Sequence, residues 1–214
     1  MTQSSVLERA RPRARQLTAR AQATRQALLK AAERTFGRSS YEAASIADIV
    51  RRARVAQGTF YLYFPDKKAI FVELVRELGA QLRQALRAAT APCTTRLDVE
   101  REGLRAFLHF SRDHRDLYRI VRQCEFVDAK AYRAYYQSLA DAYARGLEQA
   151  MTANELRAGD PERIAYFLMG IADFSGMRWI LWDDAADLEA VVDEAITFIH
   201  RGLEPRPTPK ERRR

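Results

Sequence analysis

Residues 57–63, Gln-Gly-Thr-Phe-Tyr-Leu-Tyr, bring together side chains that can bind the bases and phosphates of a nucleic acid. A glutamine amide can bond adenine through two hydrogen bonds, hydroxyl groups can donate to phosphates, and leucine can contact the methyl group of thymine. Glycine has no side chain, so its backbone can approach a base edge closely. The candidate DNA contacts in this run are Gln57, Gly58, Thr59, Tyr61, Leu62 and Tyr63.

The elements around this run predict a helix-turn-helix. A first helix is expected over residues 24–36 and ends at Gly37, which is a favourable C-terminal stop. A second is expected from Ser45 to about residue 53, and the Ser45 hydroxyl can cap it together with the carboxylate three residues later. The next apolar residue, Val55, opens a third short helix that holds Phe60 and Phe64. In such an arrangement the last helix lies in the major groove of DNA.

Two further phosphate contacts are expected where helices begin, because free backbone amides at a helix N-terminus attract anions. Ser45 and its adjoining amides form one of these sites. Asp66 can cap a following helix, where Lys67 adds a cation beside the free amides. The neighbouring Arg51 and Lys68 are explained equally well as solvated surface residues.

At this point the sequence resembles a known family. The order F-G, then Y-x-x-x-S-I-A-D-I, then R-R-A-x-V-x-x-G-T-F-Y-x-Y-F-x-x-K is similar to the DNA-binding domain of TetR/AcrR-type transcriptional regulators. The resemblance covers about fifty residues. It implies a homodimer whose N-terminal domains bind a palindromic operator, usually as a repressor. It also implies a C-terminal helical domain whose small effector releases the DNA.

Three residues depart from the family pattern. Arg54 stands where the turn usually has glycine, which costs about 1 kcal/mol if the residue is left-handed. Ala56 replaces the hydroxyl residue that caps the recognition helix, a loss of about 1 kcal/mol. Ser40 occupies the customary glycine position before Tyr41. None of the three removes a group that faces the groove.

The net charge of +8 is distributed unevenly. Residues 1–76 carry 15 basic and 6 acidic side chains, whereas residues 77–203 carry 16 and 20. A basic N-terminal third joined to a mildly acidic body predicts one module that meets a polyanion and one that does not. We expect a flexible basic arm over 1–19, which we hypothesise adds salt-dependent DNA affinity. The DNA-binding domain then covers 20–66, an effector-binding and dimerisation domain 67–203, and a disordered basic tail 204–214.

The remaining sequence predicts helices alone, so the fold class is all-α. Long proline-free stretches place apolar residues at helical spacing over about 97–112, 128–153 and 187–201. Asp160-Pro161-Glu162 forms a helix start, and that helix is expected to continue toward Trp182. No segment alternates apolar and polar residues over a strand length. The last two helices are expected to pair with their copies in a homodimer.

The C-terminal domain is rich in aromatic and methionine residues, which suits a pocket for a hydrophobic effector. Polar residues within apolar helices are the better indicators of such a site. An arginine pair three residues apart can bind a carboxylate or phosphate, so a lipid with an anionic head, such as an acyl-CoA, is the expected effector. An internal Asp–Arg ion pair explains the same residues equally well. The candidate effector contacts are Arg119, Arg122, Phe126, Tyr135, Tyr143, Asp173, Phe174 and Arg178.

Other classes of function lack their sequence signals. No nucleophile elbow, phosphate loop or metal-spaced histidine set occurs, so we expect neither an enzyme nor a metal or cofactor site. The N-terminus lacks the apolar stretch of a secretory signal, and no apolar run reaches about 20 residues, which predicts a cytoplasmic protein without membrane association. Two isolated cysteines are expected to stay reduced. The main alternative is an all-helical scaffold or interaction protein without sequence-specific DNA binding.

Overall fold

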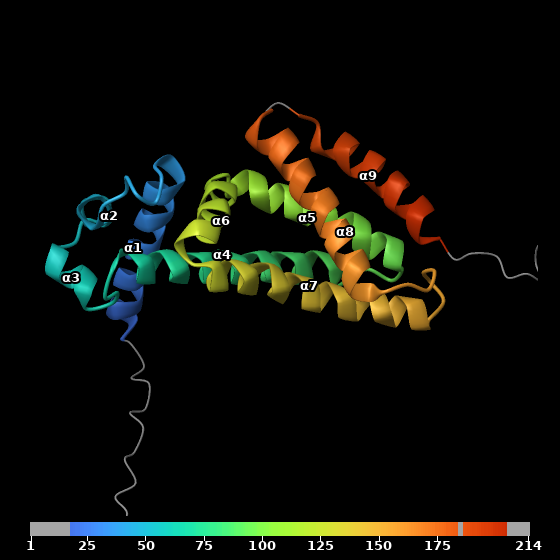
Figure 1. Ribbon diagram of the computed structural model, residues 1–214, viewed down its shortest axis with the longest axis horizontal. Coiled ribbons are helices and arrows are strands. Elements are labelled where there is room, and N and C mark those ends of the chain that lie inside the picture. Colours follow the sequence, from blue (N-terminus) through green and yellow to red (C-terminus); the bar gives the residue numbers. More distant parts are fainter. Residues whose placement is uncertain (1–17, 184–185, 205–214) are drawn as a thin grey trace, which may run out of the picture.

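The computed structural model describes residues 18–183 and 186–204. The arm predicted over 1–19 and the tail predicted over 204–214 therefore lie almost entirely outside the described residues. Within them every regular element is helical, as predicted (Figure 1). The elements are α1 (Ala19–Arg38), α2 (Ile46–Ala53), α3 (Gln57–Tyr61), α4 (Lys67–Thr90), α5 (Arg96–Asp113), α6 (Asp116–Val127), α7 (Ala129–Thr152), α8 (Pro161–Gly176), a π-helix (Met177–Leu181) and α9 (Leu188–Leu203).

The helices form two regions along the long axis of the molecule. The short helices α2 and α3 lie beside α1 at one end (Figure 1). The long helices α4 and α7 run away from them beneath α5, α8 and α9. Two buried clusters stabilise this arrangement. One joins α1–α4 to α6 and α7, and the other joins α5, α7, α8 and α9.

The first cluster is built on aromatic contacts. Phe36 and Phe71 are fully buried, with ring centroids 5.0 Å apart in an edge-to-face arrangement. Phe60 is the buried residue of α3, and it packs into the same cluster. Ile120 from α6 and Tyr135 from α7 extend the cluster beyond residue 66, where the DNA-binding domain was predicted to end. The helix-turn-helix therefore rests directly on helices of the C-terminal region.

The helix α1 differs from its prediction at both ends. It starts five residues earlier, because Thr18 provides a cap by accepting a hydrogen bond from the backbone N–H of Ala21. At the other end it continues through Gly37 to Arg38, so the prediction that Gly37 stops the helix is wrong. Gly37 serves a different need, because a Cβ there would lie 2.2 Å from the Cβ of Asp116. The absence of a side chain lets α6 begin against α1.

The recognition helix also differs from its prediction. It spans only Gln57–Tyr61, and the preceding Ala56 has extended backbone angles. The N–H groups of Tyr63 and Phe64 both donate to the carbonyl of Phe60 at 3.0 Å. The N–H groups of Leu62 and Tyr63 thus bond carbonyls only three residues back, so the helix ends in a turn instead of continuing to Phe64.

One segment, Pro161–Leu181, is long and apolar enough to cross a membrane by length and composition. This is weak evidence for a membrane span, since a core helix passes the same test. Ile164 and Leu168 of this segment pack into the second buried cluster. Part of the segment, 39% of its apolar window, is thus buried by packing inside the helical bundle.

We expect Gly37→Ala to lower the free energy of unfolding by about 1–3 kcal/mol, because the added methyl group overlaps the start of α6. Urea unfolding followed by circular dichroism measures this change. Gly202→Ala is the matched control, because nothing lies within 4 Å of a Cβ at that helical position. An equal effect of the two substitutions would contradict the role given to Gly37.

Candidate DNA-binding and effector-binding sites

The recognition helix α3 separates its buried and exposed residues clearly. Phe60 is fully buried, whereas Tyr61 is 51% and Leu62 81% exposed. Gln57 and Gly58 are also exposed, and the side chains of Thr59 and Tyr63 are half-buried. A Cβ on Gly58 would meet nothing within 4 Å, so no neighbour within the described chain requires glycine at this position. The six predicted DNA contacts of this run thus lie together on one short segment, four of them exposed and two half-buried.

The cap of α2 forms as predicted. Ser45 Oγ accepts a hydrogen bond from the Asp48 N–H at 3.1 Å and donates one to Asp48 Oδ2 at 2.6 Å. The Ser45 bond, helped by the nearby Arg51, lowers the pKa of Asp48 below its ordinary value. The hydroxyl is therefore engaged in the cap, and the adjoining amides of α2 are the groups left for a phosphate.

Lys67, a predicted phosphate contact, has partners within the protein. Its ammonium donates to the carbonyls of Tyr41 at 2.8 Å and Ala44 at 3.0 Å, and it lies 4.4 Å from the centroid of the Tyr41 ring. A cation with these partners stabilises the loop that leads into α2. Lys67 thus positions the start of the DNA-binding helices.

The turn between α2 and α3 carries the strain expected from Arg54. Its backbone is left-handed, with φ 57° and ψ 42°. Ala56 precedes α3 without a side-chain cap, also as expected. The third departure, Ser40, has no positive φ, so it needs no glycine. Two of the three departures therefore affect the approach to the recognition helix.

A hollow on the surface lies between the start of α1 and α3. The cap residue Thr18 and Arg20 and Thr24 of α1 line it, together with Thr59 and Tyr63. Hydroxyls and a cation beside a helix N-terminus form a surface suited to phosphate. The residues at the start of α1 were not predicted at this surface, although Thr18 is a cap residue that could have indicated where that helix begins.

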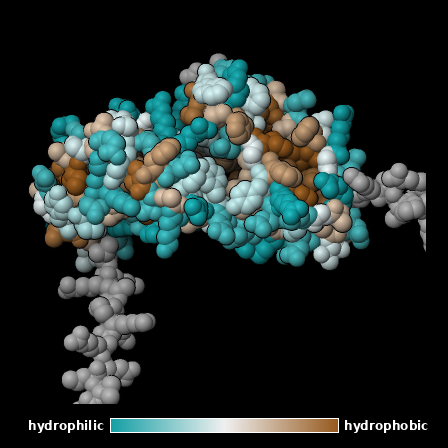
Figure 2. Space-filling model, viewed as in Figure 1, coloured by the Kyte–Doolittle hydropathy of each residue, from teal (hydrophilic) through white to brown (hydrophobic). Residues whose placement is uncertain are grey.

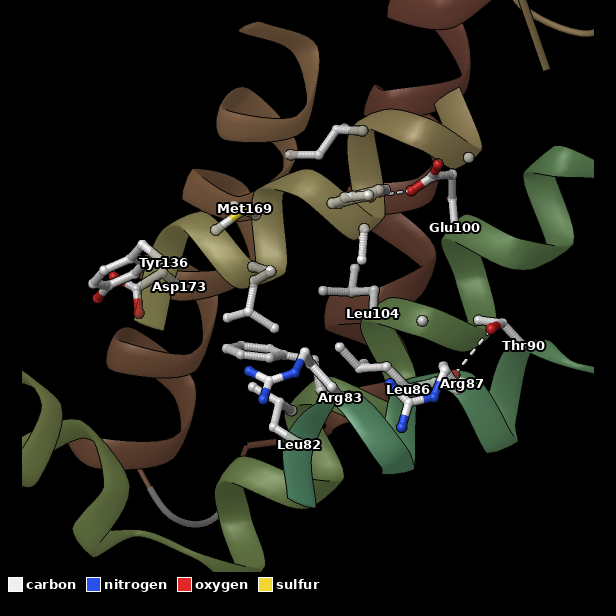
Figure 3. A pocket seen from close by; sticks show the side chains of 18 of the residues that line it. Leu82, Arg83, Leu86, Arg87, Thr90, Glu100, Leu104, Tyr136, Met169 and Asp173 are labelled. Carbon is white, nitrogen blue, oxygen red and sulfur yellow. Dashed lines mark hydrogen bonds between the residues drawn. The ribbon is translucent and has the colours of Figure 1, made fainter. Parts of the chain in front are cut away.

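The C-terminal helices enclose a cavity of about 370 Å³, which is in the usual range for a small-molecule site. Its wall is mostly apolar and is formed by α4 to α9 (Figure 3). The space-filling view shows a dark hollow near the middle of this face, with apolar side chains beside it (Figure 2). Four of the predicted effector residues line the cavity: Arg122, Tyr135, Tyr143 and Asp173.

The other four predicted effector residues lie outside the cavity wall. Arg119 points to α1, where its Nη1 donates to the carbonyl of Gly37 at 3.0 Å. Phe126 is 89% and Phe174 64% exposed. Arg178 lies in the π-helix, 3.6 Å from the carboxylate of Asp183. The helical spacing correctly found apolar stretches with embedded charge, but it could not tell which face of each helix meets the cavity.

Two arginines on α4 line the cavity and were missed in the sequence. Arg83 and Arg87 lie one helical turn apart on α4, and Figure 3 shows both side chains at the cavity. Arg83 donates to Ser138 Oγ on α7 at 2.8 Å, whereas no ion pair engages Arg87 within the described residues. The same criterion that selected Arg119 and Arg122, arginines spaced on one helix face, applies equally to this pair.

Titratable groups at one side of the cavity are strongly affected by burial. Burial raises the pKa of the Asp173 carboxyl above its ordinary value, and the nearby Arg122 opposes this only in part. Burial, and then the Asp173 carboxylate, raise the pKa of Tyr136, which lies beside it in Figure 3. Tyr136 therefore stays a neutral hydrogen-bonding group. No cluster of three metal-binding side chains lies within the described ranges.

Comparison with known proteins identifies the helix-turn-helix. Residues 28–74 match the family model described as "Bacterial regulatory proteins, tetR family". The chain belongs to the TetR family. It is a transcriptional regulator with a DNA-binding domain of that family.

Relatives of this TetR-family chain are similar along most of its length. An uncharacterised HTH-type regulator, YhgD of Bacillus subtilis, is 21% identical over 82% of this chain and 94% of its own. The fatty acid metabolism regulator of the same organism is 25% identical over 82% and 93%. The structure of Bacillus subtilis FadR with stearoyl-CoA has a TM-score of 0.75 at 18% identity, over 84% and 99% of the two chains. That last likeness shows a shared fold.

In this TetR-family chain, the helix α6 contacts both sites. Tyr118, Val121 and Arg122 line the cavity. On the α1 side, Arg119 binds the Gly37 carbonyl and Gln123 Nε2 donates to the carbonyl of Phe36 at 3.3 Å. A rigid helix with one face on the cavity and the other on the DNA-binding helices provides a direct physical connection between them.

We expect Arg54→Gly to raise the free energy of unfolding by about 1 kcal/mol, because glycine adopts the left-handed backbone without a Cβ penalty. The melting temperature should then rise by about 2–4 °C. Asn154→Gly is the matched control, since Asn154 is also left-handed but asparagine tolerates that region better. An unchanged or lower melting temperature for Arg54→Gly would contradict the strain assigned to the left-handed backbone of Arg54.

Proposed function

We propose that this TetR-family regulator is a cytoplasmic homodimeric repressor that binds a palindromic operator and leaves it when an acyl-CoA or a similar effector binds. The effector has an apolar tail and an anionic head. The division of the chain into an arm (1–19), a DNA-binding domain (20–66), an effector and dimerisation domain (67–203) and a tail (204–214) is part of this proposal.

The exposed residues of α3 support the operator contact. Gln57 and Leu62 read bases, while Thr59, Tyr61 and Tyr63 bind the sugar-phosphate backbone or base edges. The amides at the start of α2, beside Ser45, bind a phosphate. Lys67 contributes indirectly to DNA binding, because it stabilises the loop that leads into α2.

Exposed aromatic side chains on the last helices support the dimer. Phe167 on α8, Trp182 after it and Phe198 on α9 are each about two-thirds exposed, as is Phe174. Such a cluster of large apolar residues marks an interaction surface. Gly170 has open space above it, which allows a partner helix to approach closely. We therefore assign Phe174 to the α8–α9 dimer surface and not to the effector.

The observation that carries the effector class is an apolar cavity with arginines on its wall. The hydrocarbon side chains of α4, α5 and α7 suit an acyl chain, and Arg83, Arg87 and Arg122 suit its phosphate-bearing head. The names of two similar proteins, a fatty acid metabolism regulator and FadR solved with stearoyl-CoA, agree with this class. An effector that moves α6 displaces the contacts of Arg119 and Gln123 with α1, which would change the separation of the two recognition helices.

Selection of genomic fragments by the purified protein tests the operator and the dimer together. We expect the selected fragments to share an inverted repeat, with half-site centres one helical turn of about 34–36 Å, or a multiple of it, apart. A single unrepeated site would contradict binding as a symmetric dimer. Retention of every fragment without a shared sequence would support the scaffold alternative.

Release of the selected DNA by palmitoyl-CoA tests the effector. We expect palmitoyl-CoA to raise the melting temperature and to release the DNA, and free CoA to do neither, because the acyl chain supplies most of the buried apolar area. The double variant Arg83→Ala/Arg87→Ala should need at least about tenfold more palmitoyl-CoA, since each guanidinium can contribute a charge-assisted hydrogen bond. Fluorescence anisotropy of labelled DNA measures both effects.

The matched control is Arg133→Ala/Arg145→Ala, which removes two exposed arginines of α7 that do not line the cavity. It should release DNA at the wild-type concentration of palmitoyl-CoA. Stabilisation by a neutral drug-like compound, with none by any acyl-CoA, would overturn the proposed effector class.

A further inference from the structure

The end of the cavity farthest from the DNA-binding helices is polar. The helix α4 runs away from α1–α3, so its last residue, Thr90, marks this far end (Figure 1). Arg96 and Glu100 from α5 and Tyr143 from α7 line the cavity there. Figure 3 shows Glu100 and Thr90 on the opposite side of the cavity from Tyr136 and Asp173. The cavity therefore has polar side chains at both ends, and its wall between them is mainly apolar apart from Arg83 and Arg87 of α4.

The far-end cluster is tightly bonded. Arg96 Nε and Nη2 donate to Glu100 Oε1 at 2.7 and 2.5 Å, and the Tyr143 hydroxyl donates to the other oxygen of the same carboxylate. Both charged side chains are buried, with 9% of Arg96 and 3% of Glu100 exposed. The Arg96 guanidinium also lies over the Tyr143 ring, 5.5 Å from its centroid. These contacts hold all three groups in fixed positions.

Fold stability alone does not account for this cluster. Burying two charges costs desolvation free energy, and well-packed apolar side chains of similar volume are often as stabilising or more so. The rest of the cavity wall consists mainly of such apolar residues. A fixed polar cluster at the end of an apolar cavity is instead typical of a site that orients a ligand.

One donor of the cluster remains available. Arg96 Nη1 has no hydrogen-bond acceptor among the described residues, although Nε and Nη2 are both engaged. It lies beside Gly146 of α7, and a Cβ on Gly146 would come within 2.7 Å of it. On the facing helix, a Cβ on Gly103 would touch only the methyl group of Thr90, at 3.7 Å. The absence of side chains at Gly103 and Gly146 therefore leaves space at this end of the cavity, near Arg96 Nη1.

We infer that the far end is a subsite for a neutral oxygen at the distal end of the effector, which makes the effector an acyl thioester oxygenated at or near its terminal carbon. Arg96 Nη1 donates to that oxygen. A hydroxyl group fits best, because it can also donate to the Tyr143 oxygen, which keeps a free lone pair. Glu100 already neutralises Arg96, so a second carboxylate gains little there. This inference rests on the acyl-thioester class proposed above.

Matched pairs of thioesters test the subsite in the full-length protein. Each pair has the same acyl chain on CoA, from eight to sixteen carbons, ending either in a methyl or in a hydroxyl group. We expect at least one chain length at which the hydroxyl-ended thioester binds about tenfold or more tightly, as a hydrogen bond to a charged donor allows. Isothermal titration calorimetry gives both dissociation constants.

Two glycine substitutions separate the subsite from general packing. Gly146→Ala places a methyl group where Arg96 Nη1 would meet the ligand, and only the tip of a flexible side chain has to move. We expect it to abolish the preference for the hydroxyl-ended thioester, so that the two dissociation constants become about equal. Gly103→Ala narrows the same end of the cavity without touching Arg96, so it should change both affinities by the same factor and keep the preference.

The outcomes distinguish this inference from the proposed function. Equal or tighter binding of every methyl-ended thioester to the wild type would overturn the subsite and leave the effector class intact. In that case the cluster only closes the cavity and limits chain length. A preference that survives Gly146→Ala would also overturn the role of Arg96. If no thioester of either kind binds, the proposed effector class fails, and the subsite fails with it.

Discussion

The contact between the end of α1 and the start of α6 is the constraint on which the rest of the structure depends. A glycine at position 37 lets the two helices meet with almost no space between them. Arg119 then binds the carbonyl that this close approach presents, and it places a cation at the C-terminal end of the α1 dipole. Because α1 also packs against α2 and α4, the orientation of the recognition helix is fixed relative to the wall of the cavity.

The two sites use buried charge in opposite ways. In the DNA-binding region, Lys67 is satisfied by backbone carbonyls, and the exposed side chains of the recognition segment, residues 57–63, carry no charge. In the cavity, charged side chains line the ends and the α4 wall of a mainly apolar space and are only partly paired. The contacts of Lys67 fix the shape of the DNA-binding surface in the absence of DNA. The charged side chains of the cavity leave hydrogen-bonding capacity that a ligand of matching length can satisfy.

The sequence could predict the elements better than their contacts. Caps at Ser45 and Asp66 and the left-handed Arg54 follow from local chemistry, so they were predictable, and the structure confirms them. The role of Gly37 was not, because its neighbour Asp116 is distant in the chain. The cavity shows the same limit. Periodicity finds an apolar helix with embedded arginines, but Arg119 and Arg122 face different partners, and only tertiary packing decides which one meets the cavity.

The recognition helix is attached to the protein through one ring. Phe60 carries most of its packing, while about half of the neighbouring Tyr61 and most of Leu62 are exposed. Substitutions at those outward positions therefore change the exposed surface of the helix at little cost in folding free energy. Under the function proposed above, operator preference and fold stability then vary independently, and gene duplicates acquire new operators by point mutation while they keep the same fold.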